Sequence, residues 1–434
     1  MSRVAVIGAG AMGLACAYDL VKQGYTVDIY ESDDRIGGMS ASFDFDGLWI
    51  ERFYHFVCAP DYTLFDVLKE LGIYDKLKWT DTKMGFFYEG KLYKWGNPIY
   101  LLTFPKASLI AKLRYGLHIF LTSKRSNWDK LDKLNAIEWI KSWIGPKAYD
   151  IFWKSLFDLK FYEFSNSISA AWIGTRLKRV GVSRKNIFQE RLGYIEGGSE
   201  TLLKELQRRI EEKGSKVYLR RGVDEVIVRD GAVKGIRTGD DFVEYDQVVS
   251  TVPLPYVPKL VPALPEKTRN QIEKVDNVGV VCVVLKLKRR LSENFWMNIN
   301  DSRMMIPGVI EYTNLNPMQD KIVYVPFYLH VNHPKYREPN ENFIREVMGY
   351  MKMINPEFSE DWVKATHVHR YQYAQPVCPP GFMSMLPPMK SEIEGCILPI
   401  LPITIRKTGP SPIACGSDSS WRNWSERGKR VWEC

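Results

Sequence analysis

The sequence predicts an α/β protein that opens with a Rossmann-like dinucleotide-binding domain. An apolar run from Val4 to Ile7 ends in the glycine pattern Gly8-Ala9-Gly10-Ala11-Met12-Gly13. Apolar residues then recur at helical spacing, and a second apolar strand ends at Glu31. A strand, a glycine turn, a helix and a second strand with a terminal acid form the βαβ unit that binds dinucleotides.

Each part of this unit has a physical task. Gly8 permits the tight turn out of the strand, Gly10 lets backbone approach a pyrophosphate, and Gly13 lets the helix pack close to the sheet. The helix begins at Ala11 and Met12, where its unpaired N–H groups and partial positive charge face the phosphates. The pattern therefore predicts a phosphate-binding turn rather than an ordinary loop.

The acid at the end of the second strand limits the choice of nucleotide. The Glu31 carboxylate can accept both ribose hydroxyls but would repel the 2′-phosphate of NADP, so NAD and FAD stay open. A second phosphate-facing turn follows, formed by Ser32-Asp33-Asp34-Arg35-Ile36-Gly37-Gly38-Met39. Arg35 can neutralise a pyrophosphate, and the glycine pair lets backbone come close to a larger ring system.

At this point the sequence resembles the FAD-dependent amine oxidase and protoporphyrinogen oxidase superfamily, which also contains phytoene desaturases and UDP-galactopyranose mutases. The matching residues are Gly8, Gly10, Gly13, Glu31, Arg35, Gly37 and Gly38. The resemblance implies tightly bound FAD. It also implies that the chain returns to the cofactor twice, with Val223 beside the adenine and Ser250-Thr251 at the end of a nearby strand.

The expected architecture has a Rossmann-like FAD-binding domain, an antiparallel-sheet substrate domain and a helical insertion. Residues 1–85 and 193–260 are expected to form the FAD-binding domain, and residues 261–394 the antiparallel sheet. Residues 86–192 are expected to hold a substrate-side hairpin that turns at Glu89-Gly90, followed by a tryptophan-rich helical insertion that walls the substrate cavity.

Composition excludes several classes of protein. The chain has 434 residues, of which 45% are hydrophobic and 26% charged, as in globular proteins. The start of the chain runs straight into a strand, and no stretch has the apolar length of a spanning helix, so a cytoplasmic protein is expected. Seven cysteines without CxxC spacing or a Cys/His cluster predict neither a metal site nor a disulfide framework.

The net charge of +9 is compatible with nucleic acid, an acidic membrane or a merely basic surface. We expect no nucleic-acid partner, because no motif for one is present. Residues 98–125 mix apolar and basic residues and can form an amphipathic helix on an anionic membrane, or a cap helix whose apolar face belongs to the core. We favour the core interpretation and expect peripheral membrane contact only as the alternative. The oligomeric state stays open.

Catalytic candidates are few. In relatives the stretch around His55 passes beside the flavin ring, so His55 is either near the reacting centre or an ordinary hydrogen-bonded strand residue. Polar residues expected on the inner face of the substrate sheet are Asn298, Glu311, Asn314 and Tyr371. We keep His55, Glu311 and Tyr371 as catalytic candidates.

The end of the chain departs from the superfamily, which normally closes with a glycine-rich strand and a helix aimed at the flavin. Residues 395–434 instead contain two prolines in a strand-like run and then no periodicity, which predicts an aberrant, disordered tail. Codons for Leu398 to Ser419 can be chosen so that a neighbouring frame reads Ala-Asp-Thr-Ser-Tyr-Tyr-Tyr-Pro-Glu-Asp-Arg-Ser-Ile-Ala-Asp-Ser-Val-Arg-Val-Gly-Gln, which resembles the missing element. We therefore expect a frame shift near Gly395.

These observations predict an FAD-dependent oxidoreductase that transfers a hydride from a small organic substrate, an amine or a C–C or C–N bond, to flavin N5. The cofactor carries the difficult chemistry, which explains why no nucleophile or acid pair stands out. One alternative is a non-redox flavoenzyme similar to UDP-galactopyranose mutase. Another is a cofactor-binding protein without turnover, because the C-terminal FAD element is altered.

Overall fold

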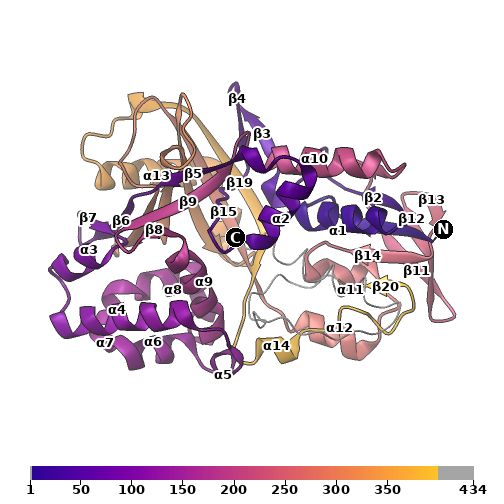
Figure 1. The fold of residues 1–434 in the computed structure, drawn as a ribbon, viewed down its shortest axis with the longest axis horizontal. Coiled ribbons are helices and arrows are strands. Elements are labelled where there is room, and N and C mark those ends of the chain that lie inside the picture. Colours follow the sequence, from indigo (N-terminus) through magenta and orange to yellow (C-terminus); the bar gives the residue numbers. More distant parts are fainter. Residues whose placement is uncertain (1, 399–434) are drawn as a thin grey trace.

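The structure is a computed structural model of the chain, and it describes residues 2–398 (Figure 1). In this part of the chain, five strands form a parallel sheet in the order β10-β2-β1-β14-β20. The strands are β1 (Arg3–Ile7), β2 (Thr26–Tyr30), β10 (Lys216–Tyr218), β14 (Gln247–Ser250) and β20 (Cys396–Ile397). The parallel pairing means that the carboxyl ends of all five strands lie along one edge.

Both faces of this sheet are covered. Alternate residues such as Val4 and Val6 pack against helices on one face, whereas Ala5 and Ile7 pack against a small antiparallel sheet on the other. The helices are α1 (Ala11–Lys22), α2 (Tyr62–Leu71) and α10 (Ser199–Glu211). The small sheet contains β11 (Glu225–Arg229), β12 (Ala232–Thr238) and β13 (Asp241–Glu244).

A second large sheet contains seven strands in the order β19-β15-β18-β17-β16-β6-β7 within the described chain. The strands are β6 (Met84–Tyr88), β7 (Lys91–Trp95), β15 (Asn277–Leu287), β16 (Trp296–Asn300), β17 (Gly308–Glu311), β18 (Lys321–Leu329) and β19 (Val363–Pro376). Helix α13 (Asn340–Ile354) covers one face. The hairpin of β3 (Ser42–Phe45) and β4 (Leu48–Glu51) lies against the other, which joins this sheet to the nucleotide-binding unit.

A helical lobe occupies the lower left of Figure 1, away from the parallel sheet. It contains α3 (Pro98–Thr103), α4 (Leu109–Lys124), α5 (Asp129–Asp132), α6 (Ala136–Ile144), α7 (Pro146–Phe152), α8 (Lys154–Phe161) and α9 (Ala170–Val182). A short sheet of β5 (Leu77–Asp81), β9 (Gln189–Ile195) and β8 (Arg184–Asn186) leads the chain back from the lobe. The remaining α-helices of the described residues are α11 (Val257–Leu260), α12 (Glu266–Glu273) and α14 (Phe382–Met385).

Several sequence predictions are confirmed by these elements. The α/β class, the βαβ unit and the return of residues 216–250 to the parallel sheet are as expected. The hairpin of β6 and β7 turns at Glu89 and Gly90, both of which have positive φ, at 46° and 77°. Positive φ at both central residues matches the twist of the flanking strands.

Two predicted boundaries are wrong. Strands β6 and β7 form the expected hairpin on the substrate side, but β6 begins at Met84, before the predicted boundary at residue 86, and pairs in parallel with β16, so that sheet is not purely antiparallel. Cys396 and Ile397, placed in the aberrant tail, form β20 and pair with β14. Their apolar side chains fit the sheet, which is why the fold continues past Gly395. The remaining part of the predicted tail, 399–434, lies outside the described residues.

The favoured interpretation of residues 98–125 is also wrong. The segment forms two helices, α3 and α4, and the large apolar side chains of α4 face away from the core. Residues Lys112, His118 and Thr122 occupy the buried side instead. Helical periodicity predicted two unlike faces correctly but could not tell which of them packs inward.

Candidate functional site

The three glycines of the turn after β1 have different roles: Gly8 and Gly13 are required by the fold, whereas Gly10 faces open space. Gly8 has φ +100°, and its N–H donates to the Tyr30 carbonyl at 2.8 Å. A Cβ on Gly13 would lie 1.9 Å from the Gly8 carbonyl oxygen, so helix and turn touch there. A Cβ on Gly10 would meet no described atom within 4 Å. The backbone of Gly10 is therefore the surface left free for a pyrophosphate.

Helix α1 begins directly at this turn, with Gly10 as its N-cap and Ala11 as its first residue. No acidic residue lies in its first turn, so nothing on the helix competes with an anionic ligand for its N–H groups. Ala11 is buried, and Met12 is half-buried beside it. The arrangement fits a phosphate at the helix N-terminus.

Glu31 lies at the carboxyl end of β2 and faces the same turn. One carboxylate oxygen accepts the N–H of Ala9 at 2.8 Å, and the other accepts the N–H of Asp33 at 2.9 Å. These bonds fix the side chain, while a carboxylate retains further lone pairs for ribose hydroxyls. Ser32, whose hydroxyl lies 3.3 Å from Glu31, is exposed beside it.

The second glycine turn packs directly on the first. The N–H of Gly37 donates to the Ala9 carbonyl at 2.8 Å, and a Cβ on Gly38 would lie 3.5 Å from the Gly10 Cα. The 3-10 turn η1 (Gly38–Ser40), which contains Met39, follows. The pair thus extends the backbone surface around Gly10 toward the second sheet.

Arg35 does not point freely into this turn. Its guanidinium binds the Asp34 carboxylate at 2.7 Å and donates to the Ser42 carbonyl at 2.9 Å. The structure therefore gives Arg35 a role in holding the loop between Asp34 and β3. Its contact with a pyrophosphate stays a prediction.

The later segments that were expected at the cofactor lie beside Glu31 and the glycine turn, and their contact with FAD stays a prediction. The N–H of Arg221 donates to the Glu31 carbonyl at 2.8 Å, which brings the neighbouring Val223 loop beside the ribose acid. Thr251 donates its hydroxyl to the Ile7 carbonyl at 2.9 Å and locks the glycine turn to β14. The buried hydroxyl of Ser250 has no hydrogen-bond partner among residues 2–398. The candidates thus gather at the carboxyl ends of β1, β2 and β14, where open α/β sheets bind ligands.

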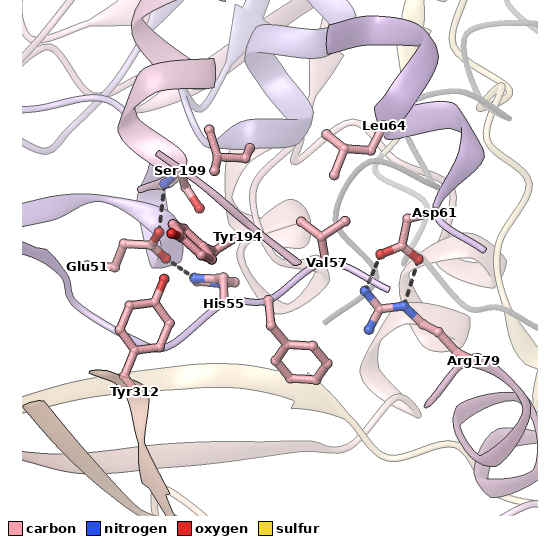
Figure 2. Close-up of a pocket in the computed structure, with 11 residues that line it drawn as sticks. Glu51, His55, Val57, Asp61, Leu64, Arg179, Tyr194, Ser199 and Tyr312 are labelled. Carbon is pink, nitrogen blue, oxygen red and sulfur yellow. Dashed lines mark hydrogen bonds and ion pairs between the residues drawn. The ribbon is translucent and has the colours of Figure 1, made fainter. Parts of the chain in front are cut away.

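His55 is held in a chain of polar contacts, of which Figure 2 shows those of Glu51 with His55 and Ser199. Its Nδ1 bonds to one oxygen of Glu51, and its Nε2 lies 3.3 Å from the hydroxyl of Ser40, which follows the second glycine turn. The other Glu51 oxygen accepts the N–H of Ser199 at 2.7 Å, at the start of α10. His55 therefore links the nucleotide side to the sheet side and has a fixed orientation.

Sequence reasoning missed Glu51, although its spacing of four residues from His55 was a usable signal. The carboxylate is 5% exposed and satisfies both the imidazole and the first N–H of α10. A small cavity of about 30 Å³ lies beside this pair and extends toward the ion pair of Asp61 and Arg179 (Figure 2). The cavity is large enough for water only.

Beyond His55, aromatic side chains lead to a cationic pair on the helical lobe. The hydroxyls of Tyr54 and Tyr328 lie 3.4 Å apart, and Lys160 Nζ lies 4.6 Å from the centre of the Tyr328 ring. Arg176 stacks 3.8 Å from the centre of the Trp172 ring, which Lys160 also approaches. Burial, aided by the Arg176 charge, lowers the pKa of Lys160 to about 7. We term these five residues the aromatic-cation cluster.

The cluster was not predicted as a site. Lys160 and Arg176 stand in an apolar helical region, but only the fold brings Lys160 to Tyr328 of β18 and both cations to the Trp172 ring. The one signal in the sequence was a charged residue, such as Lys160, that interrupts an apolar helix face. This signal does not reveal that Tyr328, on a distant strand, is its partner.

Two of the candidates on the substrate sheet have structural roles. Glu311 is fully buried, and its carboxylate accepts the N–H groups of Leu291 and Ser292 at 3.0 and 2.8 Å. Burial raises the pKa of Glu311 to about 7 against these bonds. Asn314 donates to the carbonyls of Ser292 and Asn294. Both residues hold the loop before β16, because its backbone groups need partners inside the sheet, so the prediction of a catalytic Glu311 does not fit the structure.

The other two candidates lie differently. Asn298 accepts a hydrogen bond from the Trp296 indole and lines a cavity of about 60 Å³ beneath α4 and α8, away from the glycine turns. Tyr371 is half-buried on β19, and burial, with the charges of Tyr256 and Glu31, raises its pKa to about 12. Tyr371 packs against the apolar cluster that joins the β3–β4 hairpin to this sheet, which places it on the side toward the nucleotide unit.

Comparison with known proteins agrees with this geometry. The profile of the flavin-containing amine oxidoreductase family matches residues 13–386. The 15-cis-phytoene desaturase of Synechococcus elongatus is 25% identical over 67% of this chain and 66% of its own length. The zeta-carotene desaturase of Synechocystis is 27% identical over 67% of this chain and 66% of its own length. The aligned part of this chain thus spans just under two thirds of these curated relatives.

Solved structures share the fold at low sequence identity. Cyclohexylamine oxidase from Brevibacterium oxydans superposes with a TM-score of 0.72 over 99% of this chain and 96% of its own, at 14% identity. An oxidoreductase from Methanosarcina mazei gives 0.70 over 91% and 94%, at 17% identity. The free backbone at Gly10 and the fixed Glu31 fit the FAD that this fold holds. The chain belongs to the flavin-containing amine oxidoreductase family, a family of FAD-dependent oxidoreductases.

Proposed function

We propose that the chain oxidises an apolar, unsaturated organic substrate by removing a hydride and a proton from adjacent carbons, with FAD as the hydride acceptor at N5. The convergence of Gly10, Glu31 and the Val223 loop at one sheet edge carries the cofactor part of the proposal. When bound, FAD supplies the two-electron chemistry. The protein supplies binding, orientation and exclusion of water.

The nucleotide side holds the cofactor through neutral and charged contacts. The Gly10 backbone and the first turn of α1 take the pyrophosphate, and the Glu31 carboxylate takes the ribose. The bond between Glu51 and His55 fixes the imidazole at the passage toward the substrate sheet. Because His55 is oriented by a carboxylate, it can donate or accept a proton at Nε2 without changing its position.

The aromatic-cation cluster favours C–C over amine oxidation. An amine substrate is cationic near neutral pH and would be repelled by the permanent charge of Arg176. The half-buried rings of Tyr54 and Tyr328 instead offer apolar surface to an extended hydrocarbon, with the buried Trp172 behind Lys160. The curated relatives with desaturase names point in the same direction. A Lys160 ammonium with a pKa of about 7 can be neutral at working pH and accept the substrate proton.

The test uses the purified full chain. We expect a yellow protein whose flavin band bleaches under anaerobic conditions with an acyclic polyene in detergent micelles and not with aliphatic primary amines. Bleaching by the amines alone would overturn the substrate class. A colourless protein that does not take up added FAD would overturn the enzymatic proposal, and the same assay on a chain with the neighbouring frame restored after Gly395 shows whether the tail is the cause.

A further inference from the structure

Helix α4 presents its apolar side chains to solvent. Six large residues on one side of this helix are between 45 and 72% exposed, namely Leu109, Ile110, Leu113, Leu117, Phe120 and Leu121. The opposite side, which packs on α6 and α9, carries Lys112, His118 and Thr122. A surface helix of a globular protein normally has the reverse arrangement.

Specific contacts on the buried side fix this orientation. Lys112 Nζ donates to the Leu102 carbonyl at 2.9 Å, and the His118 ring lies between Trp139 and Trp143 at 4.4 and 5.3 Å between ring centres. A rotation of α4 that buried its leucines would break the Lys112 bond and expose these indoles. The outward apolar face is therefore part of the folded state.

The apolar surface continues onto two neighbouring elements. Ile99 and Leu102 of α3 are exposed, and so are Ile187 and Phe188 at the turn between β8 and β9. The Asn97 side chain donates to the Phe188 carbonyl, which ties the hairpin turn to the start of α3. Single exposed apolar residues are ordinary, but three elements that extend one patch mark an interaction surface. We call these ten residues of α3, α4 and the hairpin turn the docking face.

The stretch of chain that carries α3 and α4 has charges of one sign. No Asp or Glu occurs between Glu89 and Asp129, whereas this stretch contains Lys91, Lys94, Lys106, Lys112, Arg114, Lys124 and Arg125. Lys112 is buried and Lys106 pairs with Glu89, so we call the exposed Arg114, Lys124 and Arg125 of α4 and its end the basic rim. Lys124 and Arg125 are exposed at the end of α4, next to Phe120 and Leu121. A second copy of the chain would bring this same basic rim against itself in a two-fold dimer. An anionic lipid surface instead complements both the apolar centre and the basic rim.

We propose that the docking face seats the protein on the surface of an anionic bilayer, with the leucines of α4 among the acyl chains and the rim at the headgroups. No helix in residues 2–398 is long and apolar enough to cross a membrane. The attachment is therefore interfacial. It does not depend on the proposed reaction, because every group involved lies outside the flavin site.

The test measures sedimentation of the full-length protein with sonicated vesicles. We expect binding to phosphatidylcholine vesicles that contain about a third phosphatidylglycerol, weakened several-fold at about 0.5 M salt. The variant with Leu113→Glu and Leu117→Glu should bind at least about 10-fold more weakly, because it removes apolar contacts and adds two repelled charges. A matched control carries Trp49→Glu and Phe242→Glu, at positions 50 and 49% exposed on other elements, and should bind as the wild type does.

A second variant guards against misfolding. Lys124→Glu with Arg125→Glu leaves the apolar face intact and should lose binding to anionic vesicles while keeping its melting temperature and any flavin absorbance. Absence of wild-type binding would overturn the proposal, as would an equal loss in the control. A different outcome would assign the docking face to a second copy of the chain. In that case the wild type is a dimer in solution and does not bind vesicles, and the Leu113→Glu and Leu117→Glu variant is a monomer.

Discussion

Replacing Gly10 and Gly13 one at a time by alanine separates ligand binding from folding. The two residues belong to the same turn, yet a Cβ on Gly10 would meet no described atom within 4 Å, whereas one on Gly13 would lie 1.9 Å from the Gly8 carbonyl oxygen. Gly10 also has φ −66° and ψ 174°, which alanine adopts without strain. The two variants should therefore fail in different ways.

The expected magnitudes follow from these contacts. In Gly13→Ala, the new Cβ would overlap the Gly8 carbonyl oxygen, so α1 must shift by more than about 1 Å to restore van der Waals contact. This strain lowers the free energy of unfolding by about 3 kcal/mol or more. In Gly10→Ala the apoprotein should gain about 0.4–1 kcal/mol, since alanine restricts the unfolded chain. The new methyl group then separates the backbone from the pyrophosphate, and a packing cost of about 1–3 kcal/mol weakens FAD binding about 5- to 150-fold.

Two measurements check this. Urea unfolding of the apoproteins gives the stability change, and the flavin absorbance retained through a desalting column, with titration of the apoprotein by FAD, gives the affinity change. Equal destabilisation of both apoproteins, or full FAD affinity in Gly10→Ala, would refute the assignment of Gly10 to the ligand.

Three further outcomes follow from the site and the core. Glu31→Gln should weaken FAD binding about 10-fold, because an amide is a poorer ribose acceptor than a carboxylate, and titration of the apoprotein measures this. Burial lowers the pKa of His118 from its ordinary 6.5 to about 4, so only the unfolded chain takes up its proton between these values. The free energy of unfolding should therefore fall by up to about 3 kcal/mol as pH drops from 6.5 to 4. Urea unfolding of His118→Leu over the same pH range should show a decrease that is smaller than that of the wild type by this amount. Turnover should rise with pH through about 7 as Lys160 becomes neutral, and Lys160→Met should lower it at least about 10-fold and abolish that step in the pH profile.

The outcomes that would count against these expectations are equally specific. An unchanged pH profile in Lys160→Met would remove this residue from the proton path. A His118→Leu protein with the same acid sensitivity as the wild type would place the responsible group elsewhere, and His369, whose pKa burial lowers to about 3, is the next to replace. Unaltered affinity in Glu31→Gln would mean that its bond to Ala9 is its main role.

The part of the fold that local sequence determines was predictable. The turn at Gly8 needs a positive φ, the approach at Gly13 needs a missing Cβ, and strand β2 ends at Glu31, all within one short segment. Contacts between distant segments were not predictable in the same way. Glu311 shows this, because its polar character marked it as a candidate while only the fold reveals the N–H groups of Leu291 and Ser292 around it.

Helix α4 shows a second limit. Its period was clear from the sequence, but the choice of the buried side depends on Trp139 of α6, which offers His118 a ring to pack on. The end of the chain shows a third limit. Cys396 and Ile397 form a strand because they pair with the edge of β14. A strand of two residues is too short to show a periodic pattern in the sequence.

The docking face and the aromatic-cation cluster are built on the same lobe. Helix α4 packs on α9, and α9 carries Trp172 and Arg176, whose partner Lys160 lies on the neighbouring α8. A substrate of the apolar kind proposed above partitions into lipid rather than water. If the lobe rests on the bilayer through α4, then α4 and α9 are the two helices between the acyl chains and the side chains proposed to contact that substrate. The two proposals, membrane attachment and an apolar substrate, would together account for the outward apolar face of α4 and the cationic pair, neither of which the nucleotide-binding unit requires.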